Sequence, residues 1–178
     1  MSRGATLGVD ANPERLRHVM HAEAERILTT LAATPGLIAG IASGYDSAQL
    51  HRNPAPDAWS ARDILAHLRA CAVVWSRSID RMLAEAHPTI RYVSPRTWIK
   101  RSDFLAQDFQ TLLPAFTAER TVLLAALRPL DARGWRRGAA FTGTTLGKAA
   151  TVLGYAQRMA EHEVGHLDQL RRTLGPRG

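Results

Sequence analysis

The sequence predicts an all-α domain, built as a four-helix bundle with short extra helical pieces. Two observations carry this prediction: apolar residues recur at helical spacing in four long blocks, and no alternating apolar and polar run is long enough for a strand. The chain has 178 residues, 46% of them hydrophobic, so one domain over 1–178 with a single sizeable core is expected. Residues 1–11 lie outside the helical pattern and are expected to be flexible.

The first predicted helix begins at Asn12 or Pro13, which form an N-cap and first-turn pair. It is expected to kink or restart at Pro35, because proline has no N–H to donate to the helical ladder, and a further short helix is expected over 36–43. The following segment, 44–59, is rich in turn-forming residues and is predicted to be a linker.

The second predicted helix starts with the clearest local signal in the chain. Ser60 and Asp63 have the types and spacing of a capping box, in which each side chain bonds to the backbone N–H of the other. An apolar face follows up to about Ala86, and Pro88 stops the helix.

A third helix is expected over 104–127, capped by Ser102 or Asp103, with Pro114 as the position for a bend. The stretch 129–143 is predicted to be a connecting loop. The last helix is expected to begin near 144–145, or at the latest at Thr151, and to end at about Leu174 before a Gly-Pro stop signal.

Composition argues against several classes of protein. The net charge is +7, but the basic residues are scattered along the chain, so no nucleic-acid partner is expected. No apolar run approaches the roughly 20 residues that a membrane span needs, and no secretory-type segment opens the chain. We therefore expect a cytoplasmic protein without a membrane partner. Cys71 is the only cysteine, which excludes an intramolecular disulfide.

The motif that bears most on function is HEVGH, which begins at His162 and ends at His166 and satisfies the metalloprotease pattern H-E-x-x-H. On a helix these two imidazoles lie on one face and can bind one cation, but a protein zinc site needs at least three ligands. The extended metzincin pattern requires a glycine and then a ligand histidine downstream, but those two positions hold Gln169 and Arg172. A downstream carboxylate ligand is also missing, since past His166 only Asp168 is acidic. A third protein ligand must therefore come from upstream.

The upstream histidines differ in their surroundings. His18 and His21 lie early on the first helix, His51 is in the linker and His87 is at a helix end. His67 lies in the interior of the second predicted helix between two leucines. A lone histidine there is more often a hydrogen-bonded core residue, but the i,i+4 pair on the last helix makes a ligand role the better interpretation.

Two segments carry a family resemblance: WSARDILAHL at 59–68 and AEHEVGHLDQL at 160–170. In composition, order and separation they resemble the two signatures of the DinB-like (YfiT-type) superfamily of helical-bundle metalloproteins. The resemblance implies an up-down-down-up four-helix bundle in which His67, His162 and His166 bind one divalent metal ion, completed by water. It also implies a homodimer, and some relatives use a low-molecular-weight thiol as co-substrate.

Three imidazoles plus water suit zinc, nickel or iron, so the sequence leaves the metal open. Glu163 is a candidate catalytic residue, acting as general base as in zincins. Its position turns it about 100° from the ligand face, which favours a solvated or inter-helix acid instead. Asp63 could orient His67, but its place in the capping box already explains it.

Three further residues near the motifs have a structural and a functional interpretation. Cys71, one turn after His67, is either a soft metal ligand or, more commonly for such a residue, a small buried hydrophobe. Tyr155 and Met159 either line a pocket or belong to the core, which is the default. Gly165 could allow a close helix approach, at a cost of about 1 kcal/mol against alanine.

The leading hypothesis is a divalent-metal-dependent enzyme of DinB type. Its reaction on a small-molecule substrate would be a thiol-dependent S-transfer or isomerisation, or a hydrolysis. The alternative is a non-enzymatic metal- or ligand-binding bundle. A third reading, an arginine-rich nucleic-acid binder, predicts affinity that falls steeply with salt.

Overall fold

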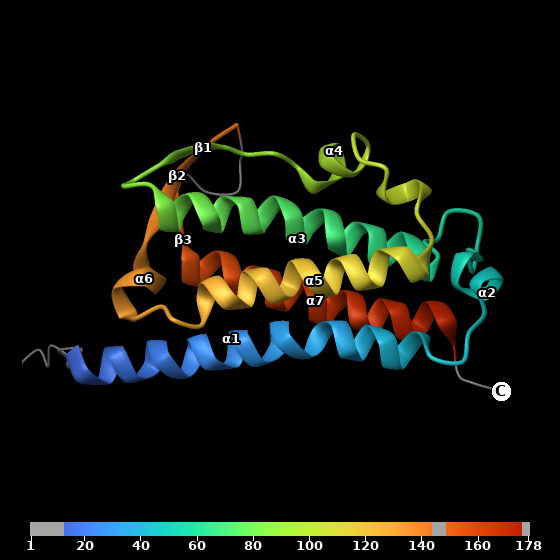
Figure 1. Ribbon diagram of the computed structural model, residues 1–178, viewed down its shortest axis with the longest axis horizontal. Coiled ribbons are helices and arrows are strands. Elements are labelled where there is room, and N and C mark those ends of the chain that lie inside the picture. Colours follow the sequence, from blue (N-terminus) through green and yellow to red (C-terminus); the bar gives the residue numbers. More distant parts are fainter. Residues whose placement is uncertain (1–12, 144–148, 176–178) are drawn as a thin grey trace, which may run out of the picture.

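The computed structural model describes residues 13–143 and 149–175, and its body is a bundle of four long helices (Figure 1). They are α1 (Pro13–Ala42), α3 (Ala61–Ala84), α5 (Phe109–Leu127) and α7 (Val152–Leu174). α1 and α7 run in one direction and α3 and α5 in the other, which is the up-down-down-up order. α7 and α5 each pack against both α1 and α3, and the predicted fold class is confirmed.

Short elements connect the long helices. They are α2 (Ser47–His51), β1 (Thr89–Arg91), α4 (Pro95–Ile99), the 3₁₀ helix η1 (Phe104–Ala106), α6 (Ala132–Arg136), β2 (Gly138–Thr142) and β3 (Ala149–Thr151). The expected flexibility of 1–11 and the earliest expected start of the last helix, at 144–145, lie outside the described residues. Among the described residues, no helix is long and apolar enough to cross a membrane.

The expectation that the chain has no strands was wrong. β1, β2 and β3 form a sheet in that order, with β1 parallel to β2 and β2 antiparallel to β3. The predicted loop 129–143 accordingly holds α6 and β2. Two of the strands have only three residues, too few to show an alternating pattern. Gly138 allows the close pairing, since a Cβ there would lie 2.6 Å from the carbonyl oxygen of Ala150.

α1 continues through Pro35 as one helix, so the predicted restart and the separate helix over 36–43 were wrong. Pro35 is buried, and Thr34 before it donates a side-chain hydrogen bond to the carbonyl of Thr30 (3.0 Å). Leu31 and Ile38, on either side of this turn, are fully buried, and α1 packs against α5 and α7. Tertiary packing thus outweighs the loss of one backbone hydrogen bond.

The predicted helix start was confirmed for α3 and wrong for α5. The Ser60–Asp63 capping box at the start of α3 is confirmed. The third long helix does not begin at Ser102 or Asp103: η1 comes first, the backbone turns extended at Gln107, and Asp108 caps α5 through Thr111 N (2.7 Å). α7 begins after Thr151, the latest of the expected starts.

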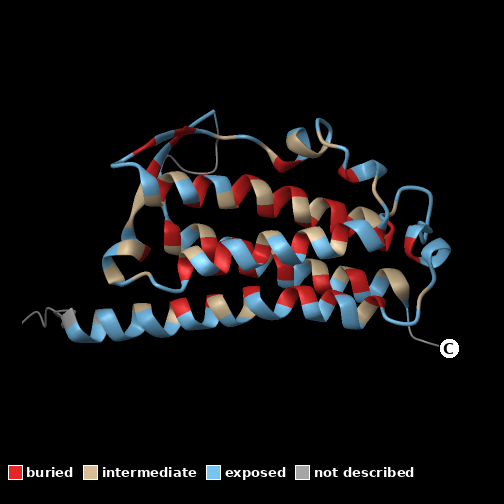
Figure 2. Ribbon diagram, viewed as in Figure 1, coloured by how far each residue is buried: buried red, intermediate tan, exposed pale blue. Residues whose placement is uncertain are grey.

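The buried residues face the interior of the bundle, and the residues of the first turns of α1 whose burial is described are exposed (Figure 2). They form two hydrophobic clusters, one at the sheet end and one at the α2 end. Between the clusters each long helix contributes polar residues, which are Thr34 from α1, His67 from α3, Arg120 from α5 and His162, Glu163 and His166 from α7. This polar layer contains the candidate site.

Candidate metal centre

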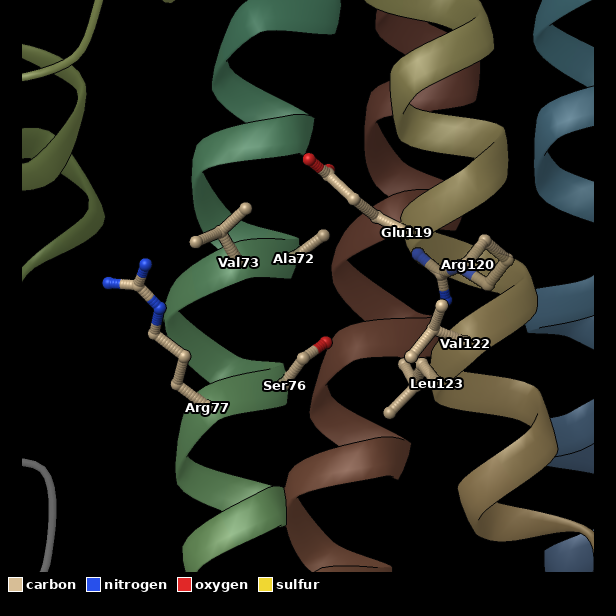
Figure 3. A pocket seen from close by; sticks show the side chains of 8 residues that line it. All are labelled: Ala72, Val73, Ser76, Arg77, Glu119, Arg120, Val122 and Leu123. Carbon is tan, nitrogen blue, oxygen red and sulfur yellow. The ribbon is translucent and has the colours of Figure 1, made fainter.

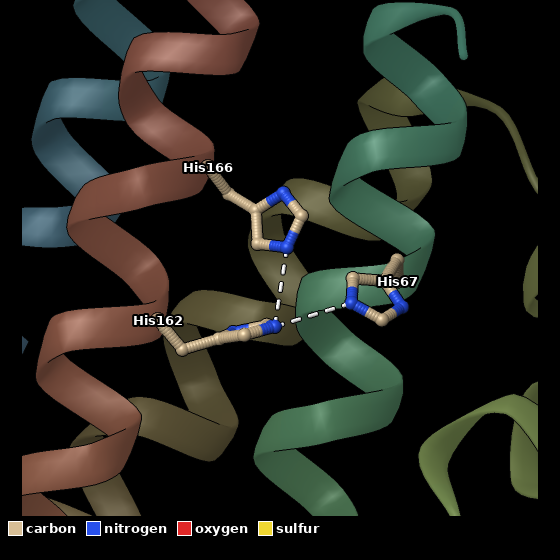
Figure 4. A group of neighbouring side chains, drawn as sticks. All are labelled: His67, His162 and His166. Carbon is tan, nitrogen blue, oxygen red and sulfur yellow. Dashed lines mark hydrogen bonds between the residues drawn. The ribbon is translucent and has the colours of Figure 1, made fainter. Parts of the chain in front are cut away.

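Three imidazoles meet between α3 and α7 (Figure 4). The Nε2 atom of His162 lies 3.2 Å from Nε2 of His67 and 3.1 Å from Nε2 of His166. One ring nitrogen from each of the three residues lies within 4.8 Å of the others. The structure thus brings together the three histidines that the sequence singled out.

Local geometry explains how they meet. His162 and His166 are separated by one turn of α7 and therefore project from the same face. His67 lies in the second turn of α3, whose start is set by the capping box at Ser60. Because α3 packs against α7 along its length, this turn lies opposite the histidine pair.

The donor set fits a divalent cation. Zinc–nitrogen distances of about 2.0–2.1 Å and tetrahedral angles place neighbouring ligand nitrogens about 3.3 Å apart, close to the 3.1 and 3.2 Å seen here. Hydrogen bonds among the rings cannot satisfy all three ring nitrogens, because His162 Nε2 carries at most one proton and faces two other nitrogens. A cation would satisfy all three lone pairs together.

The environment keeps these imidazoles neutral. Burial, with smaller contributions from the charges of His166 and Arg96, lowers the pKa of His67 to about 4. Burial also lowers the pKa of His162 to about 4, with contributions from His166, His67 and Arg158. The pKa of His166 is lowered by burial and partly restored by its hydrogen bond to a glutamine. Neutral imidazole is the form that binds metal ions.

That glutamine is Gln169, whose side-chain oxygen lies 2.7 Å from Nδ1 of His166. An amide oxygen accepts, so Nδ1 carries the proton and Nε2 keeps its lone pair for a metal. The sequence interpretation assigned Gln169 no such role. The available signal was its position three residues after His166, on the same helical face. His162 Nδ1 is buried and lacks a hydrogen-bond partner among the described residues.

Two tryptophans flank the histidines. Trp59, directly before the α3 N-cap, is 38% exposed and stacks on His166 with ring centroids 6.2 Å apart. Its ring also lies 5.0 Å from that of His67. Buried Trp75 meets His162 edge-on at 5.0 Å, and the guanidinium of Arg158 lies 5.9 Å from the Trp75 ring. Sequence reasoning did not place either tryptophan at the site.

Glu163 points elsewhere. It is 1% exposed and forms an ion pair with Arg120 of α5, which also donates to Met159 Sδ (3.5 Å). Burial raises the pKa of Glu163, while Arg120 and more weakly Thr34 oppose the rise. The carboxylate is therefore an inter-helix acid and not a solvated one. Glu163 bonds to Arg120 and not to the three histidines. Its role as general base stays a prediction.

The remaining candidates divide clearly. Asp63 bonds to Ser60 as the capping partner. Tyr155 stacks on Phe141 at 5.1 Å, and Met159 is fully buried in the core. Gly165 does not serve a close helix approach, because a Cβ there would meet nothing within 4 Å.

Cys71 is buried, and its Sγ lies 3.5 Å from His67 Nε2 and 3.9 Å from His162 Nε2. Burial raises the pKa of the thiol to about 12. Cys71 thus belongs to the hydrophobic core cluster at the sheet end, and its sulfur also faces the nitrogens of the candidate centre.

A cavity of about 220 Å³ lies between α3 and α5, on another face of α3 (Figure 3). Its lining residues are Ala72, Val73, Ser76, Arg77, Glu119, Arg120, Val122 and Leu123. The surface is mainly apolar, and the three histidines are not among the residues that line it. The cavity is therefore separate from the candidate metal centre.

The fold and site together define a class: an up-down-down-up helical bundle with three convergent histidines from its second and fourth long helices. A sequence model described as the DinB superfamily matches residues 26–170. Because the match covers most of the chain, the protein belongs to the DinB superfamily.

A solved structure gives an independent comparison. YfiT from Bacillus subtilis, described as a probable metal-dependent hydrolase with an unusual four-helix bundle topology, superposes with a TM-score of 0.69. The similarity covers 97% of this chain and 94% of that chain, at 18% sequence identity. At this identity the likeness establishes the fold alone. No curated protein sequence matched the chain.

Proposed function

We propose that this protein is a divalent-metal-dependent enzyme whose ion is bound by His67, His162 and His166. The observation that carries the proposal is the convergence of three neutral imidazole nitrogens, two pairs of them 3.1 and 3.2 Å apart. Membership of the DinB superfamily and the description of YfiT as a probable metal-dependent hydrolase support it. A bound ion would lower the pKa of a coordinated water, or activate a thiol, near neutral pH.

Other residues around the histidines would orient a ligand, contact the substrate and attract negative charge. Gln169 holds His166 in the tautomer that offers Nε2 outward. Trp59, partly exposed beside the cluster, provides an aromatic wall for a small substrate. The positive charges of Arg96 and Arg158 act on His67 and His162, and they favour reactants that carry negative charge.

The first experiment is elemental analysis of protein purified without a metal-affinity tag, followed by melting curves with zinc, nickel and iron(II). Saturating metal at about 100 times Kd should stabilise the fold by about 2.7 kcal/mol. His67→Ala should remove both the bound metal and this stabilisation. His87→Ala, at an exposed position outside the cluster, is the matched control and should keep both. A wild type that holds no metal and gains no stability would overturn the proposal.

The reaction type is tested on metal-loaded protein. Hydrolysis of small anionic esters and amides, and S-transfer with a low-molecular-weight thiol, form the two arms of the screen. Turnover that vanishes in His67→Ala but persists in His87→Ala supports the enzyme proposal and selects between the arms.

A non-enzymatic metal-binding bundle is the second candidate, and one observation favours it. Cys71 lies where a fourth protein donor could close the coordination shell, and closed four-ligand sites are typical of structural zinc. Bound metal together with no turnover in either arm would favour this candidate.

A further inference from the structure

We propose that Cys71 is a fourth protein ligand of the metal centre, so that the resting site holds its ion with three imidazole nitrogens and one thiolate sulfur. The inference rests on the proposed metal binding by the three histidines and specifies its donor set. It concerns the buried side of the cluster, which the family resemblance does not assign.

The distances between Cys71 Sγ and two of the histidine nitrogens are close to those between ligands of one metal ion. A zinc–sulfur bond of about 2.3 Å and a zinc–nitrogen bond of about 2.0–2.1 Å at tetrahedral angles place the sulfur about 3.5 Å from each nitrogen. Cys71 Sγ lies 3.5 Å from Nε2 of His67 and 3.9 Å from Nε2 of His162. The same two nitrogens face each other at 3.2 Å. These three separations lie within about 0.4 Å of those expected for ligands that share one ion. His166 is grouped with His67 and His162 but not with Cys71, so a shared ion would draw the sulfur and the His166 ring together.

Cys71 lies on the same face of α3 as His67. Cys71 follows His67 by one turn of α3, so both side chains project from the same face toward α7. Cys71 is 2% exposed and Trp75, one turn further, covers His162 edge-on. The sulfur therefore approaches from the core side of the cluster, whereas partly exposed Trp59 marks its solvent side. As the only cysteine of the chain, Cys71 has no disulfide partner within it that would compete.

The donor set has two chemical consequences. A thiolate beside three imidazoles favours thiophilic ions such as zinc and cobalt over magnesium or calcium. It also fills the fourth position of a tetrahedral ion, so a reactant must enter as a fifth ligand or displace Cys71. An external thiol is well suited to such a displacement, because it exchanges one sulfur ligand for another.

Cobalt(II) titration of the metal-free protein, followed by absorption spectroscopy in buffer without thiols, tests the proposal. Wild type should show visible ligand-field bands together with a near-ultraviolet thiolate-to-cobalt charge-transfer band. Cys71→Ala should keep the visible bands and lose the charge-transfer band. Met159→Leu removes another sulfur of the interior at nearly constant volume and is the matched control, which should retain both features.

X-ray absorption of the zinc-loaded wild type provides a readout that needs no variant. A sulfur neighbour at about 2.3 Å beside nitrogens at about 2.0–2.1 Å is expected. Cobalt or zinc bound with nitrogen and oxygen neighbours only would overturn the role of Cys71 and leave the three-histidine centre intact. Failure to bind either ion would overturn the metal centre itself, and the sulfur ligand with it.

Discussion

His162 and Glu163 are neighbours on α7, yet the interior around each is organised differently. Glu163 meets a group of opposite charge, Arg120, and both side chains are about 2% exposed. His162 meets two further imidazoles, His67 and His166, which offer the same kind of lone pair. One cluster pairs opposite charges within the chain, and the other brings together three imidazoles whose lone pairs face one another.

This difference separates structure from function. The buried ion pair joins α5 to α7 across the interior of the bundle, so we expect it to fix the position of one helix relative to the other. Three converging lone pairs at half-buried positions gain most when an external cation binds them. Both clusters lie in the same polar layer between two hydrophobic clusters, so polarity and burial alone would not distinguish them.

The largest effect should come from breaking the ion pair. Glu163→Gln leaves the Arg120 charge buried without a counter-charge and should lower the free energy of unfolding by about 3–5 kcal/mol in urea denaturation. Replacing both residues, Arg120→Met with Glu163→Leu, should recover most of that loss. Glu161→Gln, on the exposed side of α7, should change stability by less than about 0.5 kcal/mol.

The affinity of the folded Glu163→Gln protein for cobalt(II) should stay close to that of wild type. A stable variant that loses turnover while it still binds metal would instead assign Glu163 to catalysis, as a general base, and would erase the contrast between the clusters.

The second effect concerns the orientation of His166. Gln169→Ala removes the acceptor at 2.7 Å from Nδ1 and should weaken zinc binding about 10- to 100-fold in a competition titration. Asp168→Ala, at the next position and exposed, is the control and should leave affinity unchanged. Equal affinities for both variants would show that the histidine cluster needs no orienting partner.

The third effect is a pH dependence of the metal-free protein. His67 and His162 have a pKa of about 4 when folded and an ordinary value of 6.5, so the unfolded chain binds more protons between these pH values. The free energy of unfolding should therefore fall as pH decreases from 6.5 to 4, by about 2 kcal/mol for the pair after solvent screening, and should be level above 6.5.

Urea denaturation of wild type and His162→Gln at pH 7 and pH 4.5 measures this slope. The difference between the two proteins cancels the contribution of Glu163, whose raised pKa acts in the opposite direction. Parallel pH profiles for the two proteins would contradict neutral imidazoles in the folded state.

The smallest effect tests the helix between the clusters. Gly165 is exposed on α7, and an added Cβ would meet no atom within 4 Å. Gly165→Ala should raise the free energy of unfolding by about 1 kcal/mol, because alanine loses less backbone entropy in a helix. Zinc affinity should not change. A weaker affinity would show that the histidine pair depends on flexibility at this turn.

Local chemistry made part of the fold and site predictable. The capping box at Ser60 depends on residues three apart, so it defined the start of α3 before any packing was known. The spacing of His162 and His166 guarantees a shared helical face. His67 followed as the third candidate because an interior helical histidine needs a polar partner.

Other features escaped because their signals are not local. The three-residue strands carry too little pattern, and the sheet joins β1 to β2 across about 50 residues of sequence. Continuation of α1 through Pro35 depends on packing by two other helices. Trp59 belongs to a recognised motif, but its stacking on His166 appears only once α3 and α7 are aligned. The contact of Gln169 with His166 lies within α7, so its spacing was visible and only its role was missed.

By itself, the sequence determined four amphipathic helices and a pair of histidines on one face of the last, because both follow from the 3.6-residue helical period. Only the tertiary structure decided that Glu163 pairs with Arg120, 43 positions earlier in the chain, and that Cys71 faces the histidines. These contacts depend on the rotation and axial register of one helix against another, which are set by side-chain packing across the whole bundle.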